Sequence, residues 1–238
     1  MSGPVDQGAG PRYASRPEGL RTSRPWHRLA YIIEALPLGL KALVDELDGR
    51  PDLRILDYGC ADQPYRWLFA QDVDYVGADL PGNPLATVEV ADDGSLPLPE
   101  ASFDVLISTQ ALEHVEDPAL YLREAFRVLR SGGRLLLSTH GIMVYHPDPV
   151  DLWRWTGAGL RKAVGDAGFT VDRFDGIMGL TATGLQLVQD AVYWRSPRWL
   201  RPVVALLAQS LIRIVDRWDG PARRRDNALV FALLASKP

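Results

Sequence analysis

The densest group of chemically useful side chains in this 238-residue chain lies between Tyr145 and Leu160, in the segment YHPDPVDLWRWTGAGL. Flat indole faces stack on the C–H groups of a sugar ring, while carboxylate, guanidinium and imidazole groups hydrogen-bond to its hydroxyls. His146 is the candidate general base, because imidazole titrates near neutral pH and Pro147 favours an extended turn at the histidine. The expected acceptor-binding residues of the segment are Asp148, Asp151, Trp153, Arg154 and Trp155.

The same segment also has a purely structural interpretation, which the sequence leaves open. Trp153 and Trp155 are side chains of the kind that pack a loop against a domain. Asp151 and Arg154 have the spacing of an i,i+3 ion pair, and Thr156 is a typical N-cap for a following helix. A divalent ion such as Mg²⁺ is an alternative to a histidine base, because a bound metal acidifies a coordinated hydroxyl. Its candidate ligands are Asp62, Asp148 and Asp151.

A second group lies where the apolar run RILDYG passes into CADQPY. It holds Asp57 and Gly59, and Asp79 ends the next apolar run, at the place where nucleotide-binding folds grip ribose hydroxyls. A dinucleotide loop follows the pattern G-x-G-x-x-G, but here the second and third glycines are replaced by Ala61 and Pro64. Proline lacks the backbone N–H that a pyrophosphate would use. The loop therefore favours a cofactor with a ribose and no phosphate, such as S-adenosylmethionine, over NAD.

Both groups need a scaffold that brings them to one edge. Apolar runs of strand length alternate with helical patterns, which indicates an α/β fold: a Rossmann-like, mostly parallel seven-stranded sheet with helices on both faces and an antiparallel last strand. In such sheets ligands bind at the carboxyl ends of the strands. The expected strands are 54–59, 74–80, 86–90, 103–109, 134–140, 169–177 and 227–235. The expected helices are 26–47 (in one or two pieces around Pro37), 64–70, 118–130 with RSGG as its stop, 156–167, 183–194 and 197–218.

A third set of motifs lies between Ala91 and Thr139, in ADDGSLPLPEASFDVLISTQALEHVEDPALYLREAFRVLRSGGRLLLST. Together with D-x-G-C at the first strand end, it resembles the type 11 group of class I S-adenosylmethionine-dependent methyltransferases over about residues 53–169. Ala61 stands where that family usually has glycine. The resemblance implies the family's cofactor and these contacts: the methionine part beside Asp57 and Gly59, the ribose at Asp79, the adenine at Asp92, Asp93 and Gly94, and Gln110 under the methionine.

The run H-P-x-P-x-D-x-W-R-W-T also resembles a segment of type 11 sugar O-methyltransferases from actinobacterial polysaccharide gene clusters, including those for methylmannose polysaccharide. The resemblance implies methyl transfer to a sugar hydroxyl, which requires removal of the hydroxyl proton. His146 is the expected base. His140, on the same loop side, is the second choice and a further substrate-binding residue, and Tyr65 is expected to help orient the hydroxyl. Glu113 and His114 have the residue types of an acid–base pair, but they are expected instead to cap and pack the next helix.

Composition narrows the remaining choices. The net charge of −4 provides no basic field for nucleic acid, and a single cysteine, Cys60, excludes an intramolecular disulfide. No apolar run reaches the ~18 residues of a transmembrane helix. We expect a cytoplasmic enzyme with a flexible arm over 1–25 and one methyltransferase domain over 26–238, in which about 182–218 form a helical insertion.

The helical pattern over 197–218 is the basis of two alternative functions. Its apolar residues form one stripe that fits packing on the domain itself, a homodimer or a membrane surface. The competing functions are a methyltransferase for a lipid-like or quinone acceptor at a membrane, and a cofactor-binding protein without turnover. The intact cofactor set and His146 argue against the second. The stripe contains Leu200, Val203, Val204, Leu207, Ala208, Leu211, Ile214, Val215 and Trp218.

Overall fold

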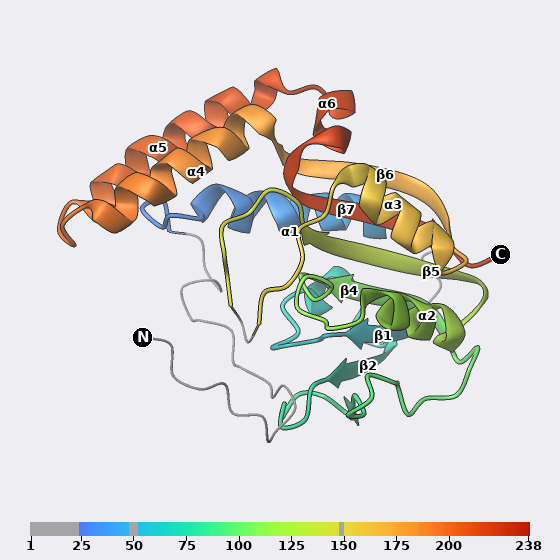
Figure 1. The fold of residues 1–238 in the computed structure, drawn as a ribbon. Coiled ribbons are helices and arrows are strands. Elements are labelled where there is room, and N and C mark those ends of the chain that lie inside the picture. The colour runs from blue at the N-terminus through green and yellow to red at the C-terminus, as the bar shows by residue number, and fades with distance from the viewer. Residues whose placement is uncertain (1–23, 48–51, 148–149) are drawn as a thin grey trace.

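The computed structural model describes residues 24–47, 52–147 and 150–238, and these ranges contain one seven-stranded sheet in the order β3-β2-β1-β4-β5-β7-β6 (Figure 1). β7 is antiparallel to both of its neighbours and every other pair is parallel, as the sequence predicted. The strands are β1 Arg54–Tyr58, β2 Asp74–Asp79, β3 Val88–Glu89, β4 Phe103–Thr109, β5 Leu129–His140, β6 Thr170–Gly179 and β7 Ala228–Ser236.

Helices cover both faces of this sheet. The apolar face of α1 packs with one buried cluster, and α2 and α3 pack with a second cluster on the other face. β4 serves both clusters: Val105 and Ile107 belong to the first, Phe103 and Leu106 to the second. This explains why its sequence is apolar at nearly every position. The helices are α1 Ala30–Val44, α2 Pro118–Val128, α3 Gly157–Asp166, α4 Leu180–Arg195, α5 Arg201–Val215 and α6 Pro221–Asp226, with 3₁₀ turns η2 Arg66–Leu68 and η3 Asp216–Trp218.

Two predictions of element boundaries were wrong. The helix expected over 64–70 is the single turn η2, because the Arg66 guanidinium binds the carbonyls of Phe69, Ala70 and Gln71 at 3.3, 2.7 and 3.0 Å and the chain leaves the turn extended. The RSGG stop is instead the first part of β5, where Gly132 N–H donates to the Lys237 carbonyl at 2.8 Å.

The sequence also missed α6. It begins with Pro221 in its first turn, a favoured position, and packs closely against β6. A Cβ on Gly176 of β6 would lie 1.9 Å from the Arg224 carbonyl oxygen, so only glycine allows this approach. α1 is one helix with Pro37 inside it, and no helix in the described ranges is long and apolar enough to span a membrane.

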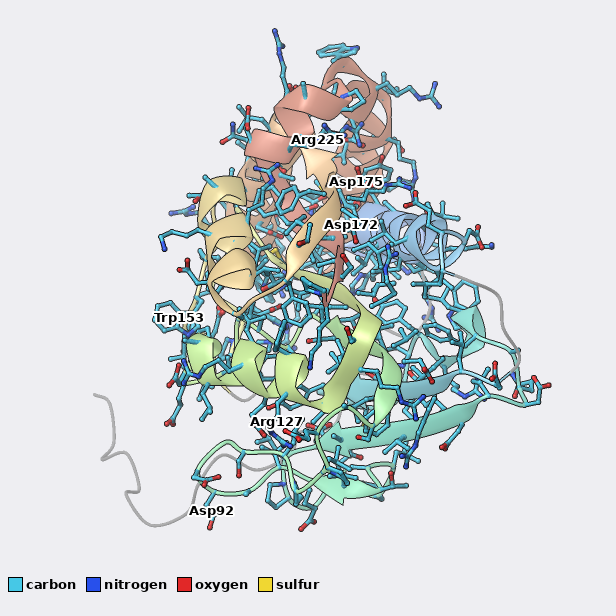
Figure 2. The ribbon with its side chains drawn as sticks, turned by 90° about the vertical axis from the view of Figure 1, so that its right-hand side faces the viewer. Asp92, Arg127, Trp153, Asp172, Asp175 and Arg225 are labelled. Atoms are coloured by element: carbon cyan, nitrogen blue, oxygen red, sulfur yellow. The ribbon has the colours of Figure 1, made fainter. Side chains whose placement is uncertain are left out.

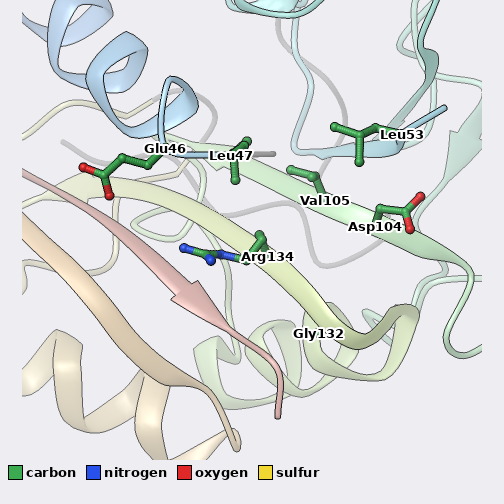
Figure 3. A pocket seen from close by; sticks show the side chains of 7 residues that line it. All are labelled: Glu46, Leu47, Leu53, Asp104, Val105, Gly132 and Arg134. Atoms are coloured by element: carbon green, nitrogen blue, oxygen red, sulfur yellow. The ribbon is translucent and has the colours of Figure 1, made fainter. Parts of the chain in front are cut away.

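The structure has a small pocket at the amino-terminal end of the sheet, lined by Glu46, Leu47, Leu53, Asp104, Val105, Gly132 and Arg134 (Figure 3). Ligands of such sheets bind at the opposite, carboxyl-terminal edge. Asp104 at this pocket has a structural role. Its side chain accepts from Arg54 N–H at 2.9 Å and from the Arg130 guanidinium at 2.7 Å, and so links three strands.

Candidate active site

The loop after β1 turns back on β2 at Gly59. The backbone N–H groups of Gly59 and Cys60 both donate to the Ala78 carbonyl, at 2.8 and 3.1 Å. Gly59 has φ +77°, and a Cβ there would lie 2.6 Å from the Ala111 Cβ, so this position requires glycine. Ala61 follows with φ +45°, a left-handed conformation that disfavours any side chain. The loop keeps its shape without the glycine usual in the family, at the cost of this strain.

Asp79 fixes the loop from the end of β2. Its Oδ2 accepts from Ala61 N–H at 2.8 Å and from the Asn83 amide at 2.6 Å, and its Oδ1 accepts from Leu80 N–H at 2.8 Å. A carboxylate offers about four acceptor sites, so Oδ1 retains capacity for one more donor. Asp79 therefore organises the loop and fits a ribose hydroxyl as an additional partner.

Asp57 is a buried acid at the end of β1. The Tyr75 hydroxyl donates to its Oδ2 at 2.6 Å. Burial raises the pKa of Asp57 to about 7, the Tyr75 hydrogen bond works against that rise, and the nearby Asp79 charge adds to it. An ammonium group placed beside Asp57 would favour the ionised form, so this acid fits the amino group of a methionine-like ligand.

The expected adenine site is a loop after β3. Asp92 is exposed in it, at the bottom of the view in Figure 2. Asp93 accepts from the Ser95 hydroxyl at 2.6 Å and the Ser95 N–H at 2.9 Å, which holds the pKa of Asp93 below its usual value. Gly94 has φ +82°, and its carbonyl is 3.5 Å from the Tyr58 hydroxyl. The loop is thus shaped by its own side chains and tied to β1.

Gln110 ends β4 in a left-handed conformation, with φ +53°. Its amide donates to Ser138 Oγ at 3.0 Å, which joins the ends of β4 and β5. Because β4 lies between β1 and β5 in the sheet, Gln110 lies between the strands that lead into the loop after β1 and the loop after β5.

The segment after β5 lies against the segment after β4. The backbone N–H groups of Leu152 and Trp153 both donate to the Glu113 carbonyl, at 2.9 and 3.2 Å, and the Trp153 indole donates to the Val115 carbonyl at 2.8 Å. Figure 2 shows Trp153 beside α2. Trp155 N–H donates to the His140 carbonyl at 3.1 Å. We call residues 143–155 the acceptor loop; of these, 148 and 149 lie outside the described residues, and Asp148 with them.

Asp151 and Arg154 give the acceptor loop its shape. They form a two-pronged ion pair with N–O distances of 2.5 Å, which confirms the expected i,i+3 pair. Arg154 also donates to the carbonyls of Met143 and Val144, and Asp151 accepts from His146 N–H at 2.6 Å. Burial opposes ionisation of Asp151, but these hydrogen bonds outweigh it and keep its pKa below the usual value. The pair thereby fixes the backbone at His146.

Three histidine rings meet at this edge. The ring of His146 is 5.9 Å from that of His114 and 5.8 Å from that of His140, and the last two are 6.4 Å apart. His140 is 5% exposed, and its Nε2 lies 3.3 Å from Glu113 Oε1. Burial lowers the pKa of His140, and the Glu113 charge opposes that change. His114 Nδ1 hydrogen-bonds the Val150 carbonyl.

Glu113 is the residue that the sequence interpretation misjudged. It is fully buried, and its Oε2 accepts from Thr139 Oγ1 at 2.7 Å. The helix cap predicted for it is provided by Asp117, whose Oδ1 accepts from Ala119 and Leu120 N–H, each at 2.9 Å. The sequence does carry a signal for a role in the site. Glu113 is directly followed by a histidine just past the end of a central strand, and sites form at that edge of the sheet.

The remaining candidates are divided. Tyr65 is buried among the apolar residues under α1, and Cys60 is buried with a pKa raised by burial, so both have visible packing roles. Trp153 is 40% exposed and Trp155 is half-buried. Asp62 is half-buried and lies in the loop after β1, residues 59–65, which we call the cofactor loop. In the described ranges no group of three or more histidine, cysteine or acidic side chains is arranged to hold a metal ion.

The loop after β1, Asp79 and the carboxyl ends of β1 to β4 lie in a segment that matches a known family. Residues 56–137 match the family described as a methyltransferase domain. Over about a third of its length, the chain is therefore similar to a methyltransferase domain.

Two curated proteins extend the match. A probable S-adenosylmethionine-dependent methyltransferase of Mycolicibacterium smegmatis is 39% identical over 83 residues, which cover 32% of this chain and 32% of that protein. The 27-O-demethylrifamycin SV methyltransferase of Amycolatopsis mediterranei is 34% identical over 131 residues, covering 46% of this chain and 47% of the relative. The matches thus span less than half the length of either relative.

Solved structures share the fold over most of the chain. The [4+2]-cyclase SpnF superposes with a TM-score of 0.55 and 20% identity, covering 86% of this chain and 82% of SpnF. At that identity the likeness concerns the fold alone, and one fold hosts different activities.

Proposed function

We propose that the protein is an S-adenosylmethionine-dependent O-methyltransferase whose acceptor is a hydroxyl of a sugar or oligosaccharide, such as a mannoside, in polysaccharide biosynthesis. The observation that carries the proposal is the acceptor loop: two hydrogen bonds to the Glu113 carbonyl hold it at the carboxyl edge, beside the methyltransferase-domain segment. The loop thereby supports a histidine and two indole rings at the edge where the cofactor loop also ends.

The chain's residues fit the proposed cofactor. Asp57 would hold the amino group, Asp79 a ribose hydroxyl, and the loop of Asp92, Asp93 and Gly94 the adenine. When bound, S-adenosylmethionine supplies an electrophilic methyl group on a sulfonium sulfur. The protein's main catalytic contribution is then to align acceptor and methyl for in-line transfer.

His146 is the proposed base. The His146 imidazole would accept the proton of the acceptor hydroxyl as that oxygen is methylated. The Asp151 hydrogen bond to its backbone sets the position of His146, and the buried Glu113 carboxylate beside His140 and His114 favours the positive charge that develops. Trp153 and Trp155 are proposed to face the sugar ring.

A second candidate is a lipid-like or quinone acceptor at a membrane surface. It is favoured by one observation, the exposed apolar side chains of α5. The two candidates predict different products from one enzyme preparation.

The test is transfer of labelled methyl groups to a panel of mannosides, other mono- and oligosaccharides, quinones and lipids, with and without EDTA. We expect a labelled sugar and no effect of EDTA. A labelled quinone or lipid alone would favour the second candidate, and loss of turnover in EDTA would replace His146 by a metal.

Asp79→Ala provides the control for the cofactor side. It removes charge-assisted hydrogen bonds, so calorimetry should show S-adenosylmethionine affinity weakened by about 1.5–3 kcal/mol. Unchanged affinity, or binding of NAD by the unaltered protein, would contradict the cofactor assignment.

A further inference from the structure

α4 and α5 lie side by side and extend beyond the sheet as a helical hairpin (Figure 1). The hairpin leaves the domain at the end of β6, and β6 runs in the same direction as β5 because both are antiparallel to β7. The hairpin and the acceptor loop therefore emerge from the same edge of the sheet.

The inner face of the hairpin combines apolar side chains that join the core, such as Ile212 and Val215, with a cluster of buried glutamines. The side-chain amides of Gln186, Gln189 and Gln209 all donate to the Arg28 carbonyl, at 3.0, 2.7 and 2.8 Å. All three glutamines are buried, and Gln209 also donates to the amide oxygens of the other two, at 2.9 and 2.7 Å. These buried amides are satisfied by one another and by the carbonyl of Arg28, just ahead of α1, so hydrogen bonds add to apolar packing in holding the hairpin to the domain.

The outer face of the hairpin is apolar. On α5 the exposed side chains recur at three- and four-residue spacing, opposite to Gln209, so they form one stripe. A helix of a soluble protein normally turns its polar side towards solvent, so an exposed apolar stripe is unusual. The stripe consists of Val203, Leu207, Leu211, Ile214 and, in η3, Trp218, and the exposed Trp194 and Trp199 lie at the hairpin tip.

The exposed charges on the hairpin are all positive. Over 180–218 the acidic residues are Asp190 and Asp216, which are 3% and 1% exposed and paired with Arg28 and Arg224. The same range contains five arginines, although the chain as a whole has a net charge of −4. One of the five, Arg213, pairs with Glu34 of α1. The five are Arg195, Arg198, Arg201, Arg213 and Arg217.

We propose that this outer face docks on an anionic lipid surface. An apolar stripe with exposed tryptophans and arginines is the composition of helices that lie in a membrane interface, where arginines meet lipid phosphates. A symmetric dimer through the same face would place arginines against arginines with no exposed hairpin acid to pair them. Docking would hold the acceptor loop at the lipid surface, and it does not depend on which acceptor the enzyme uses.

The experiment is co-sedimentation of the full chain with vesicles of phosphatidylcholine containing phosphatidylglycerol, compared with pure phosphatidylcholine. We expect at least about tenfold stronger partitioning to the anionic vesicles, released at about 0.5 M NaCl. Arg198→Glu at the exposed tip should weaken partitioning roughly tenfold, and Trp199→Ala should also weaken it. Arg123→Glu, the same charge change on the exposed side of α2, should leave it unchanged.

Circular dichroism and S-adenosylmethionine affinity check that each variant is folded. Several results would overturn the proposal: no binding to anionic vesicles, equal binding to both vesicle types, or equal loss in Arg123→Glu and Arg198→Glu. Sedimentation velocity tests the other possible partner of this face, a second copy of the chain. If the protein does not bind vesicles but forms a dimer that Leu207→Asp dissociates, the face is a dimer interface.

Discussion

At the scale of single residues, His146 carries the proposed chemistry. His146→Ala should lower kcat by about 10²–10⁴ and leave S-adenosylmethionine affinity intact. The acidic limb of the pH–rate profile should disappear, because a protonated imidazole accepts no proton. Initial rates of methyl transfer against pH measure both effects, and His27→Ala, ahead of α1, is the matched control. A near-normal kcat with the acidic limb preserved would move the base to His140.

Ala61 gives a prediction on stability. Its left-handed conformation costs a residue with a side chain roughly 1–2 kcal/mol. Glycine would avoid this cost, but it loses more conformational entropy on folding than alanine does, which cancels part of the gain. Ala61→Gly should therefore raise the free energy of unfolding by about 0.5–1 kcal/mol, measured by urea denaturation. Ala191→Gly, within the exposed side of α4, should lower it by a similar amount. Destabilisation by Ala61→Gly would show that the loop is not strained.

At the scale of elements, the acceptor loop is held by backbone and indole contacts to the segment after β4. Trp153→Phe keeps a flat ring but removes the 2.8 Å hydrogen bond to the Val115 carbonyl, while Trp153→Ala removes both. If the ring binds acceptor, Trp153→Ala should raise the acceptor KM at least about tenfold at constant cofactor affinity, and Trp153→Phe much less. Equal effects of the two variants, accompanied by equal falls in Tm, would identify a packing role.

The sequence predicted the sheet, its order of elements and the antiparallel last strand, because these follow from apolar runs and short connections. It did not predict η2 or α6. Both depend on partners distant in sequence or on a side chain that binds its own turn, as Arg66 does. Glu113 was missed for a related reason: its role arises from contacts with Thr139 and His140 on another strand. A resemblance or a spacing indicates which residues share an edge but not which of them touch.

At the scale of the whole molecule, Asp57 links folding to pH. Its pKa is about 7 in the fold against an ordinary 3.8, so between these values the native state holds a proton that the unfolded state has lost. Stability contributed by this group is present below about pH 4 and is lost as pH rises to about 7, by about 4 kcal/mol at most. Asp57→Asn removes the buried charge.

Thermal denaturation of both proteins measures this effect. We expect similar Tm values at pH 5 and a higher Tm for Asp57→Asn at pH 8, together with weaker S-adenosylmethionine binding, because the ligand's ammonium loses an anionic partner. A Tm difference that does not change with pH would show that Asp57 keeps its ordinary pKa in the fold.

The two hydrogen bonds that reach the Glu113 carbonyl come from main-chain N–H groups, and any residue except proline supplies such a group. Leu152, Trp153 and Trp155 can therefore be substituted while these backbone bonds and the Asp151–Arg154 pair keep the path of the loop. Related proteins with this loop would acquire new acceptors by single substitutions at Trp153 and Trp155, with the loop conformation unchanged. A library restricted to Leu152, Trp153 and Trp155 should accordingly be rich in folded proteins, and it is the economical place to search for altered specificity.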